Sequence, residues 1–420
     1  MEHSASTPTL GGRAGSTPYE GGLGGPQSES QRVAAWEAWQ DRDRETERVG
    51  ALPHSALVNT ANRGDRGDRQ RQGGNGHEVR TLVGGVGPGF EETHEYKLRG
   101  PTGVAYRGGG EDDDSPPCMY VADTSNHCIR RFTALKPSSS LLDGKSTVLA
   151  GQPGRAGHAD CGSAVLPAEC LLSHPTSLAW YGQDNLIVTD YSNHCVRMIQ
   201  VHTGETRTLA GQPGVAGYRN GAGAGEALFS CPYGVAVCGE GGCIIVSDSH
   251  NHCLRRLSPN TTGGGGGWTV DTLAGPSPST GSRSMPVAGV VDGSADVASF
   301  RFPAGLCVAS GTESPQDEED DDDAVIVADQ GNHAIRLVHL TTGRVVTIGG
   351  GGGSVGGFKD GPGPMSLFNR PVGVMAWVSG DAVCTIFVCD AVNQRVRVMT
   401  RKGSGGEWFV RSLAGNGQEG

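Results

Sequence analysis

Short apolar runs separated by turn residues repeat along residues 78–420 in five similar units. Each unit contains a run led by Pro, a run that ends in Asp, a run that carries Arg and a run that ends in Gly. In one unit these runs are "PYGVAV" (232–237), the two halves of "VSDSHNHCLRRL" (246–257) and "VDTLAG" (270–275). Such runs, bounded by Gly, Pro, Asn and Asp, are typical of β-strands. Four-stranded units in series predict an all-β fold, a β-propeller of four-stranded blades.

The turn between the second and third predicted strands repeats three residue types at fixed spacing. In every unit Asp is followed by Asn three residues later and by Arg four residues after that. The repeat signature consists of Asp123, Asn126, Arg130, Asp190, Asn193, Arg197, Asp248, Asn251, Arg255, Asp329, Asn332, Arg336, Asp390, Asn393 and Arg397. Asp and Asn side chains bond nearby backbone N–H groups in turns. We expect a structural role for the signature, in which an Asp–Arg contact contributes about 1–3 kcal/mol per blade.

Four of the five units place His directly after Asn, which raises the question of a metal site. These residues are His127, His194, His252 and His333. Equivalent positions of different blades lie around a ring and far apart, whereas zinc needs its ligands about 2 Å away. We therefore predict no metal site and no cofactor from these residues. The following Cys128, Cys195 and Cys253 correspond to Ala334 in the fourth unit, which favours packing as small apolar side chains.

The units resemble NHL repeats, which are named for the triplet Asn-His-Leu. Here the triplet reads Asn-His-Cys at 126–128, 193–195 and 251–253, and Asn-His-Ala at 332–334. The last copy departs from the pattern, with Asn-Gln-Arg at 393–395. The resemblance spans residues 78–420 and implies an NHL-repeat β-propeller. It also implies a binding platform, because the family uses its propellers mostly in that way, but it does not specify a partner.

A degenerate sixth blade is predicted ahead of the five clear ones. "EVRTLVGG" (78–85) resembles a last strand, and "LVNTANRGDR" (57–66) keeps the signature spacing at Asn59, Asn62 and Arg66. The predicted domains are an NHL-repeat propeller at 50–420, with 78–420 the better supported part, and a tail at 1–49. The tail is rich in Gly, Ser and Pro, so we expect it to be disordered. A short helix is predicted within residues 31–48.

Composition and charge agree with a propeller and lower the expectation of nucleic-acid binding. Gly accounts for 69 of 420 residues, and a glycine content this high favours many turns and short strands. The net charge is −11. Two runs, Glu111–Asp114 and Asp317–Asp323, together contain 11 acidic residues. We interpret both as solvated loops, with a docking site for a basic partner or for cations as the alternative. No basic run is present, so nucleic acid is not the favoured partner.

The expected setting is a soluble intracellular protein, because residues 1–16 contain no apolar signal region and no run of about 18 apolar residues exists. The chain has twelve Cys and no C-x-x-C pair. Without a signal region, we expect reduced thiols rather than a disulfide framework. A monomer is predicted.

The leading functional hypothesis is a non-enzymatic scaffold that binds a protein through its inter-blade loops. The predicted innermost strands, such as "GVAY" (103–106) and "GLCV" (305–308), contain no His, Asp or Glu, which argues against a channel active site. A metal-dependent lyase or lactonase, as found in propellers similar to this family, is the alternative, and RNA binding is the second alternative. The loops share Asn220-Gly221, Asp292-Gly293 and Asp360-Gly361 as turn dipeptides. Phe229, Phe300 and Phe368 recur in them and are predicted to pin each loop to the next blade.

Overall fold

The computed structural model describes most of the chain after residue 97. The described residues are 98–107, 117–134, 145–162, 169–239, 242–260, 267–277, 286–309, 323–351, 355–379, 382–401 and 406–417. The predicted tail at 1–49, its short helix and the degenerate sixth blade lie outside these residues. The acidic runs do too, except for Asp323.

The strands form five antiparallel sheets, which we call blades one to five in chain order. Blade one contains β1 (Gly103–Arg107), β2 (Cys118–Asp123), β3 (Cys128–Thr133) and β4 (Lys145–Ala150), and blade two contains β5 (Pro175–Tyr181), β6 (Asn185–Asp190), β7 (Cys195–Gln200) and β8 (Thr206–Ala210). Blade three contains β10 (Pro232–Cys238), β11 (Cys243–Asp248), β12 (Cys253–Pro259) and β13 (Trp268–Ala274), and blade four contains β14 (Pro303–Ala309), β15 (Ala324–Asp329), β16 (Ala334–His339) and β17 (Val345–Gly349). Blade five contains β19 (Pro371–Ser379), β20 (Ala382–Asp390), β21 (Arg395–Arg401) and β22 (Trp408–Ala414).

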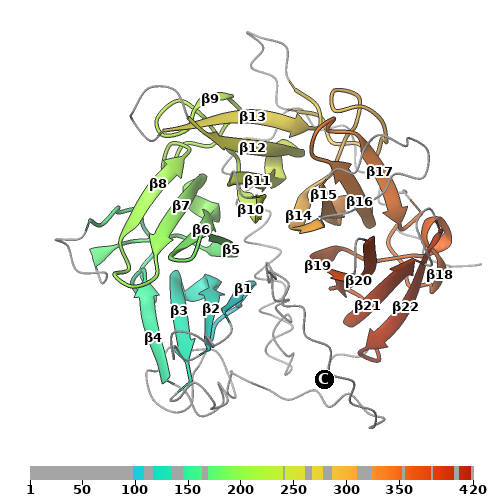
Figure 1. Ribbon diagram of the computed structural model, residues 1–420, viewed down its shortest axis with the longest axis horizontal. Helices are drawn as coiled ribbons and strands as arrows, with labels where there is room; N and C mark the ends of the chain where they lie inside the picture. Colours follow the sequence, from blue (N-terminus) through green and yellow to red (C-terminus); the bar gives the residue numbers. More distant parts are fainter. Residues whose placement is uncertain are drawn as a thin grey trace, which may run out of the picture. The chain divides into compact units, whose positions relative to one another are not determined.

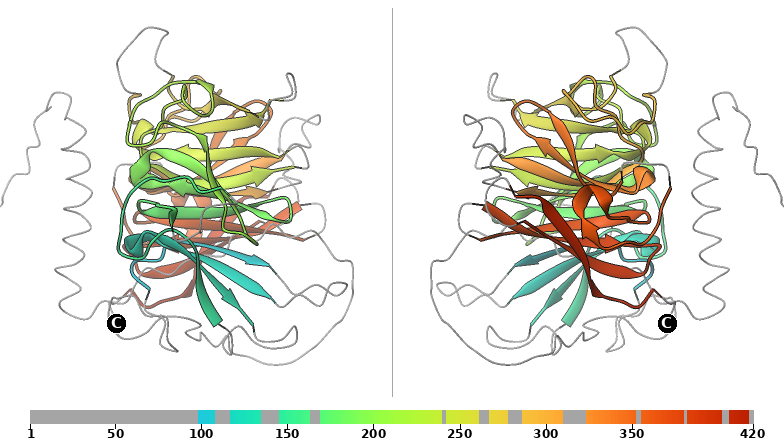
Figure 2. Two further views of the ribbon diagram at one scale, coloured as in Figure 1. Left: turned by 90° about the vertical axis from the view of Figure 1, so that its left-hand side faces the viewer. Right: turned by 90° about the vertical axis from the view of Figure 1, so that its right-hand side faces the viewer.

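The blades are arranged radially with the first strand of each blade innermost (Figure 1). Neighbouring blades pack through these inner strands, β1 on β5, β5 on β10, β10 on β14 and β14 on β19. Seen from the side, the blades are twisted and follow one another around the ring (Figure 2). The structure thus confirms the all-β propeller and shows five blades among the described residues, but it does not show the predicted sixth blade there.

The hydrophobic core lies between blades rather than within any one of them. We call the face of a blade that packs on the next blade its forward face, and the opposite face its backward face. Blade four contributes Cys307, Ile326 and Ala328 from its forward face to one cluster. Ile386 and Met399 of blade five pack against them from the backward face of that blade. A single sheet cannot bury both of its faces, so each blade depends on its neighbours.

The inter-blade loops also run along the outer edge of the following blade. Two short strands, β9 (Gly221–Ala222) and β18 (Gly361–Pro362), pair with the outermost strands β13 and β22. The loop ahead of blade four reaches its outer strand through the pairing of Gly293 with Val345. These loops therefore cover the outer edge of the blade that each of them enters. The physical reason is that an unpaired outer strand exposes a row of N–H and C=O groups.

Within the described residues, no helix is long and apolar enough to cross a membrane.

Candidate functional site

The signature turn has the same construction in blades one to four, and blade three illustrates it. Asp248 ends β11, a single 3₁₀ turn η5 (Ser249–Asn251) follows, and His252 adopts a left-handed backbone with φ 55°. The Oδ1 atom of Asp248 accepts a hydrogen bond from the backbone N–H of Ser230 at 2.8 Å. Its Oδ2 atom accepts bonds from Asn251 Nδ2 and Arg255 Nη1, both at 2.8 Å. One carboxylate therefore joins the turn, the third strand and the chain segment that enters the blade.

The other blades repeat these bonds around a buried Asp–Arg pair. Asp–Arg distances are 2.7–2.8 Å throughout, and both side chains are at most 1% exposed. The pairs are Asp123–Arg130, Asp190–Arg197, Asp248–Arg255, Asp329–Arg336 and Asp390–Arg397. In blade one the donor is Nε of Arg130 rather than Nη1. The Asn of each signature donates to the same carboxylate.

Burial affects the protonation of these carboxylates. Loss of solvent raises the pKa of Asp248 to about 6, although the neighbouring Arg255 and the bonds from Asn251 and Ser230 oppose the shift. Burial raises the pKa of Asp329 to about 6 in the same way, against the effect of Arg336. Both pKa values remain below 7, so these Asp–Arg pairs are ionic at neutral pH.

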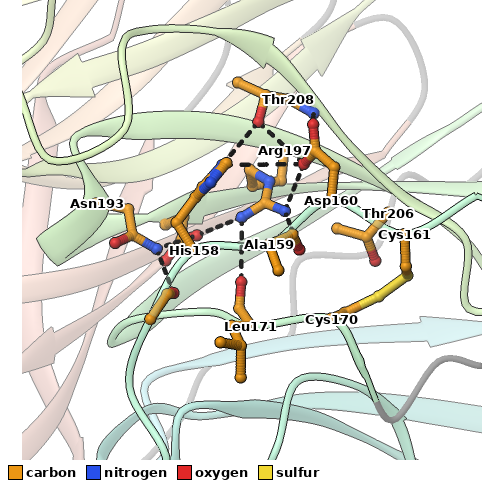
Figure 3. A network of polar contacts seen from close by, with 12 residues as sticks. His158, Ala159, Asp160, Cys161, Cys170, Leu171, Asn193, Arg197, Thr206 and Thr208 are labelled. Atoms are coloured by element: carbon orange, nitrogen blue, oxygen red, sulfur yellow. Dashed lines mark hydrogen bonds and ion pairs between the residues drawn. A yellow bond between two sulfur atoms is a disulfide. The ribbon is translucent and has the colours of Figure 1, made fainter.

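A second set of bonds attaches the signature to the inter-blade loop that precedes its blade. In blade two, Nη2 of Arg197 donates to the carbonyl of Ala159 at 3.0 Å and to Oδ1 of Asp160 at 2.6 Å (Figure 3). Asn193 donates from Nδ2 to the carbonyl of Gly157 at 2.8 Å. The Asp160 carboxylate also accepts the backbone N–H of Thr208 in the outermost strand. The loop is thereby fixed to both the turn and the edge of the blade.

The loop residue that receives the Arg recurs at a defined position. Blades three, four and five use Asn220, Asp292 and Asp360, each 2.6 Å from Nη2 of the blade's Arg. From the sequence we assigned these three residues only to tight turns, and Asp160 was not singled out. A signal was present, because each follows a Gly by three residues in "GHAD" (157–160), "GYRN" (217–220), "GVVD" (289–292) and "GFKD" (357–360).

Phenylalanine completes the attachment of three loops. Phe229, Phe300 and Phe368 are fully buried, each within an apolar cluster that includes residues of the following blade. The guanidinium groups of Arg255, Arg336 and Arg397 lie 5.0–5.2 Å from the centres of these rings. The predicted pinning of loop to blade by Phe is therefore present.

The signature His makes a contact to the next blade that was not predicted from the sequence. Nδ1 of His194 accepts the backbone N–H of Cys231 at 3.1 Å, which joins blade two to the entry of blade three. The same bond runs from His174 to His127, from Phe302 to His252 and from Arg370 to His333, at 3.0–3.2 Å. Each His therefore links its blade to the next. Burial lowers the pKa of His194 to about 4, so its ring is neutral and able to accept this bond at pH 7.

The signature cysteines pack as predicted. Cys128, Cys195 and Cys253 have no exposed surface, and burial raises the pKa of the Cys128 thiol to about 12. The expectation of reduced thiols was wrong for one pair, since Cys161 and Cys170 form a disulfide (Figure 3). The loop folds back on itself through the pairing of Ala159 with Leu171, which brings the two cysteines together. Their spacing along the sequence contains no such information. The other nine cysteines that the structure describes are thiols.

Most of the large apolar side chains left exposed lie in the inter-blade loops. Of fourteen such residues among those described, nine are there: Val215, Val287, Val290, Val291, Val297, Phe302, Val355, Phe358 and Met365. Val287 and Val355 are exposed by more than three quarters. Within the described part of the chain, no group of three or more His, Cys, Asp or Glu is arranged to hold a metal ion. Among the described residues, the loops thus carry most of the exposed large apolar side chains.

These features define a five-bladed β-propeller with a repeated Asp–Asn–Arg turn. The model of the NHL repeat matches residues 229–257, which run from the entry of blade three to its third strand. The chain is 29% identical over 235 residues to "Protein SUPPRESSOR OF QUENCHING 1, chloroplastic" of Arabidopsis thaliana, covering 54% of this chain and 18% of that protein. It is 27% identical over 183 residues to "NHL repeat-containing protein 2" of Bos taurus, covering 42% of this chain and 24% of that protein. The matches confirm the resemblance to NHL repeats inferred from the motif.

The chain matches only about a fifth to a quarter of the length of these two relatives. A solved structure of an auxiliary nutrient binding protein from Bacteroides ovatus also aligns with it. That alignment has a TM-score of 0.47 and 16% sequence identity, and it covers 76% of this chain and 60% of the other.

Proposed function

We propose that this chain is a non-enzymatic, monomeric scaffold that binds a partner protein through its inter-blade loops. The supporting observation is the concentration of exposed large apolar side chains in loops that are themselves firmly held. Arg336 fixes the loop ahead of blade four at Val291 and Asp292, while Val287 and Val297 of that loop remain exposed. Loops carried by a rigid scaffold are common sites of recognition, and exposed apolar patches mark interaction surfaces.

Paired substitutions test this role. Val297→Asp and Val355→Asp place a charge in two loops at side chains that are 57% and 78% exposed. Gln183→Asp, at an exposed residue between β5 and β6, introduces the same charge away from these loops. Cross-linked affinity capture with the full chain should recover partners with wild type and Q183D and lose them with the loop double variant V297D/V355D. Equal recovery by all three proteins contradicts the proposal, provided that their melting temperatures agree.

A degenerate sixth blade formed within residues 50–97 remains part of this proposal. The forward face of blade five carries Trp377 and Leu413, exposed by 56% and 49%. Val104, Val121 and Phe132 form an apolar cluster on the backward face of blade one. Residues 78–85 have the pattern of a last strand, so one further sheet from this segment would meet both faces.

An aspartate placed on this face tests the sixth blade in the full chain. Ile348 of blade four and Leu413 of blade five occupy equivalent positions, and Ile348 is 7% exposed. Ile348→Asp should lower the free energy of unfolding by more than about 3 kcal/mol, because it buries an unpaired charge. If a sixth blade covers Leu413, L413D should lose a similar amount in denaturant titration. A loss below about 0.5 kcal/mol, typical of open surface, excludes that cover.

A further inference from the structure

Blade three contains a pair of opposed cysteines that the signature does not explain. Cys238 ends β10, Cys243 begins β11, and the two residues face each other directly across the strands. A hydrogen bond joins their side chains. Directly opposed residues of antiparallel strands have Cα atoms about 4.5–5.5 Å apart, which lies within the Cα separation of about 4.4–6.8 Å that disulfides span. A bond between these two sulfurs therefore requires little movement of the backbone.

The other blades show that this position does not need sulfur. Blade four has Ala309 opposite Ala324 at the same place in the register, and blade two has Tyr181 opposite Asn185. Among the five described blades, two thiols oppose each other here only in blade three. The pair is thus a feature of one blade and not a requirement of the fold.

The two thiols differ in exposure and in acidity. Cys238 is 4% exposed, whereas Cys243 is only partly buried. The hydrogen bond from Cys238 lowers the pKa of Cys243 to about 7, with help from the guanidinium of Arg256 and against the effects of burial and Asp323. By contrast, burial raises the pKa of Cys253 well above its usual value. A partly exposed, acidic thiol beside a second thiol has the arrangement of a redox-sensitive pair.

We propose that Cys238 and Cys243 form an oxidisable dithiol in which Cys243 reacts with peroxide and Cys238 resolves the product. The Cys243 thiolate attacks one peroxide oxygen, so an S–O bond forms, the O–O bond breaks and water leaves after protonation. The sulfur of Cys238 then attacks the sulfenic sulfur of Cys243, the S–O bond breaks, and a second water leaves with the thiol proton. Two thiols are oxidised to one disulfide, and hydrogen peroxide is reduced to two molecules of water.

Mass spectrometry of the full chain after brief treatment with hydrogen peroxide at pH 7 tests the proposal. In the wild type, alkylation of the remaining thiols should reveal a new 238–243 disulfide, with Cys195 and Cys253 still reduced. In Cys238→Ser, Cys243 has lost its resolving partner and should accumulate as a sulfenic acid that dimedone captures. Cys243→Ser should give neither product. A new disulfide at another pair, or no dimedone adduct on C238S, overturns the proposal.

Two controls separate reactivity from folding. The double variant C238A/C243A copies Ala309 and Ala324 of blade four, so it should keep the wild-type melting temperature and form no new disulfide. Before oxidation, Cys243 should react with iodoacetamide severalfold faster than Cys118, because the hydrogen bond from Cys238 and the guanidinium of Arg256 lower the pKa of the Cys243 thiol. Equal rates at Cys243 and Cys118, which are both partly buried, refute the assignment of Cys243 as the attacking thiol.

Discussion

Blades three and five contain the same signature but differ at their forward faces. Blade three is covered by blade four, and His252 accepts a bond from the backbone N–H of Phe302 there. Blade five has Gln394 in place of His, with the same left-handed backbone, and its Leu413 is half exposed. Yet the Asp390–Arg397 pair is as short and as buried as Asp248–Arg255.

The comparison separates two functions within one repeated motif. Asp, Asn and Arg hold a blade to its own entry and to the loop before it, so they are needed whether or not another blade follows. His reaches forward, so it is found where the structure shows a following blade. A motif that looks like one unit in the sequence therefore makes two attachments. Asp, Asn and Arg make the backward attachment to the preceding loop, and His makes the forward attachment to the next blade.

Removing the carboxylate should have the largest effect, and it should be equal in the two blades. Asp248→Ala and Asp390→Ala each leave a buried guanidinium without its counter-charge, which costs about 3–5 kcal/mol. Denaturant titration should give similar losses for both variants. Asp296→Ala is the control, since Asp296 is exposed in an inter-blade loop and its removal should leave the unfolding midpoint unchanged. A much smaller loss for D390A would show that the attachment depends on a following blade.

Acid should weaken the forward attachment selectively. The pKa of His194 is lowered to about 4 in the fold, so between pH 6.5 and 4 the unfolded chain binds the proton more readily. The stability due to His194 is complete above pH 6.5 and should decline by about 3 kcal/mol as the pH falls to 4. His194→Gln introduces the residue that blade five uses and removes this decline. Asp248 and Asp329 titrate in both proteins, so the difference between the two stability profiles isolates His194. Parallel profiles would contradict this account.

At neutral pH the forward bond should be the smallest effect. His252→Gln removes the acceptor for Phe302 N–H and should lower stability by about 1 kcal/mol, as expected for one hydrogen bond. Gln394→Asn in blade five keeps a residue that tolerates the left-handed backbone and should change stability by less than about 0.5 kcal/mol. Melting temperatures measured at pH 7 compare the two. A larger loss for Q394N than for H252Q would reverse the proposed division of the motif.

The sequence predicted the blades well because each strand is marked locally, by a leading Pro, a terminal Asp or a terminal Gly. It also predicted the Asp–Arg pair and the burial of Phe300, since these follow from spacing and residue type. It could not predict the bond from His to the next blade, because that contact joins residues 37–50 positions apart. The bond from Arg197 to Asp160 was missed for the same reason.

The bonds from the signature Arg to the preceding inter-blade loop have a consequence for where one structural module ends and the next begins. In blades two to five, the Arg of each blade binds the inter-blade loop that precedes that blade. A structural module that keeps these bonds therefore extends from the Gly after the last strand of one blade to the Gly after the last strand of the next, for example from Gly211 to Gly275. A duplication, graft or exchange that cuts at the Pro ahead of the inner strand would separate Arg255 from Asn220. Cutting at the glycines would transfer a blade together with the loop that pairs with its outermost strand.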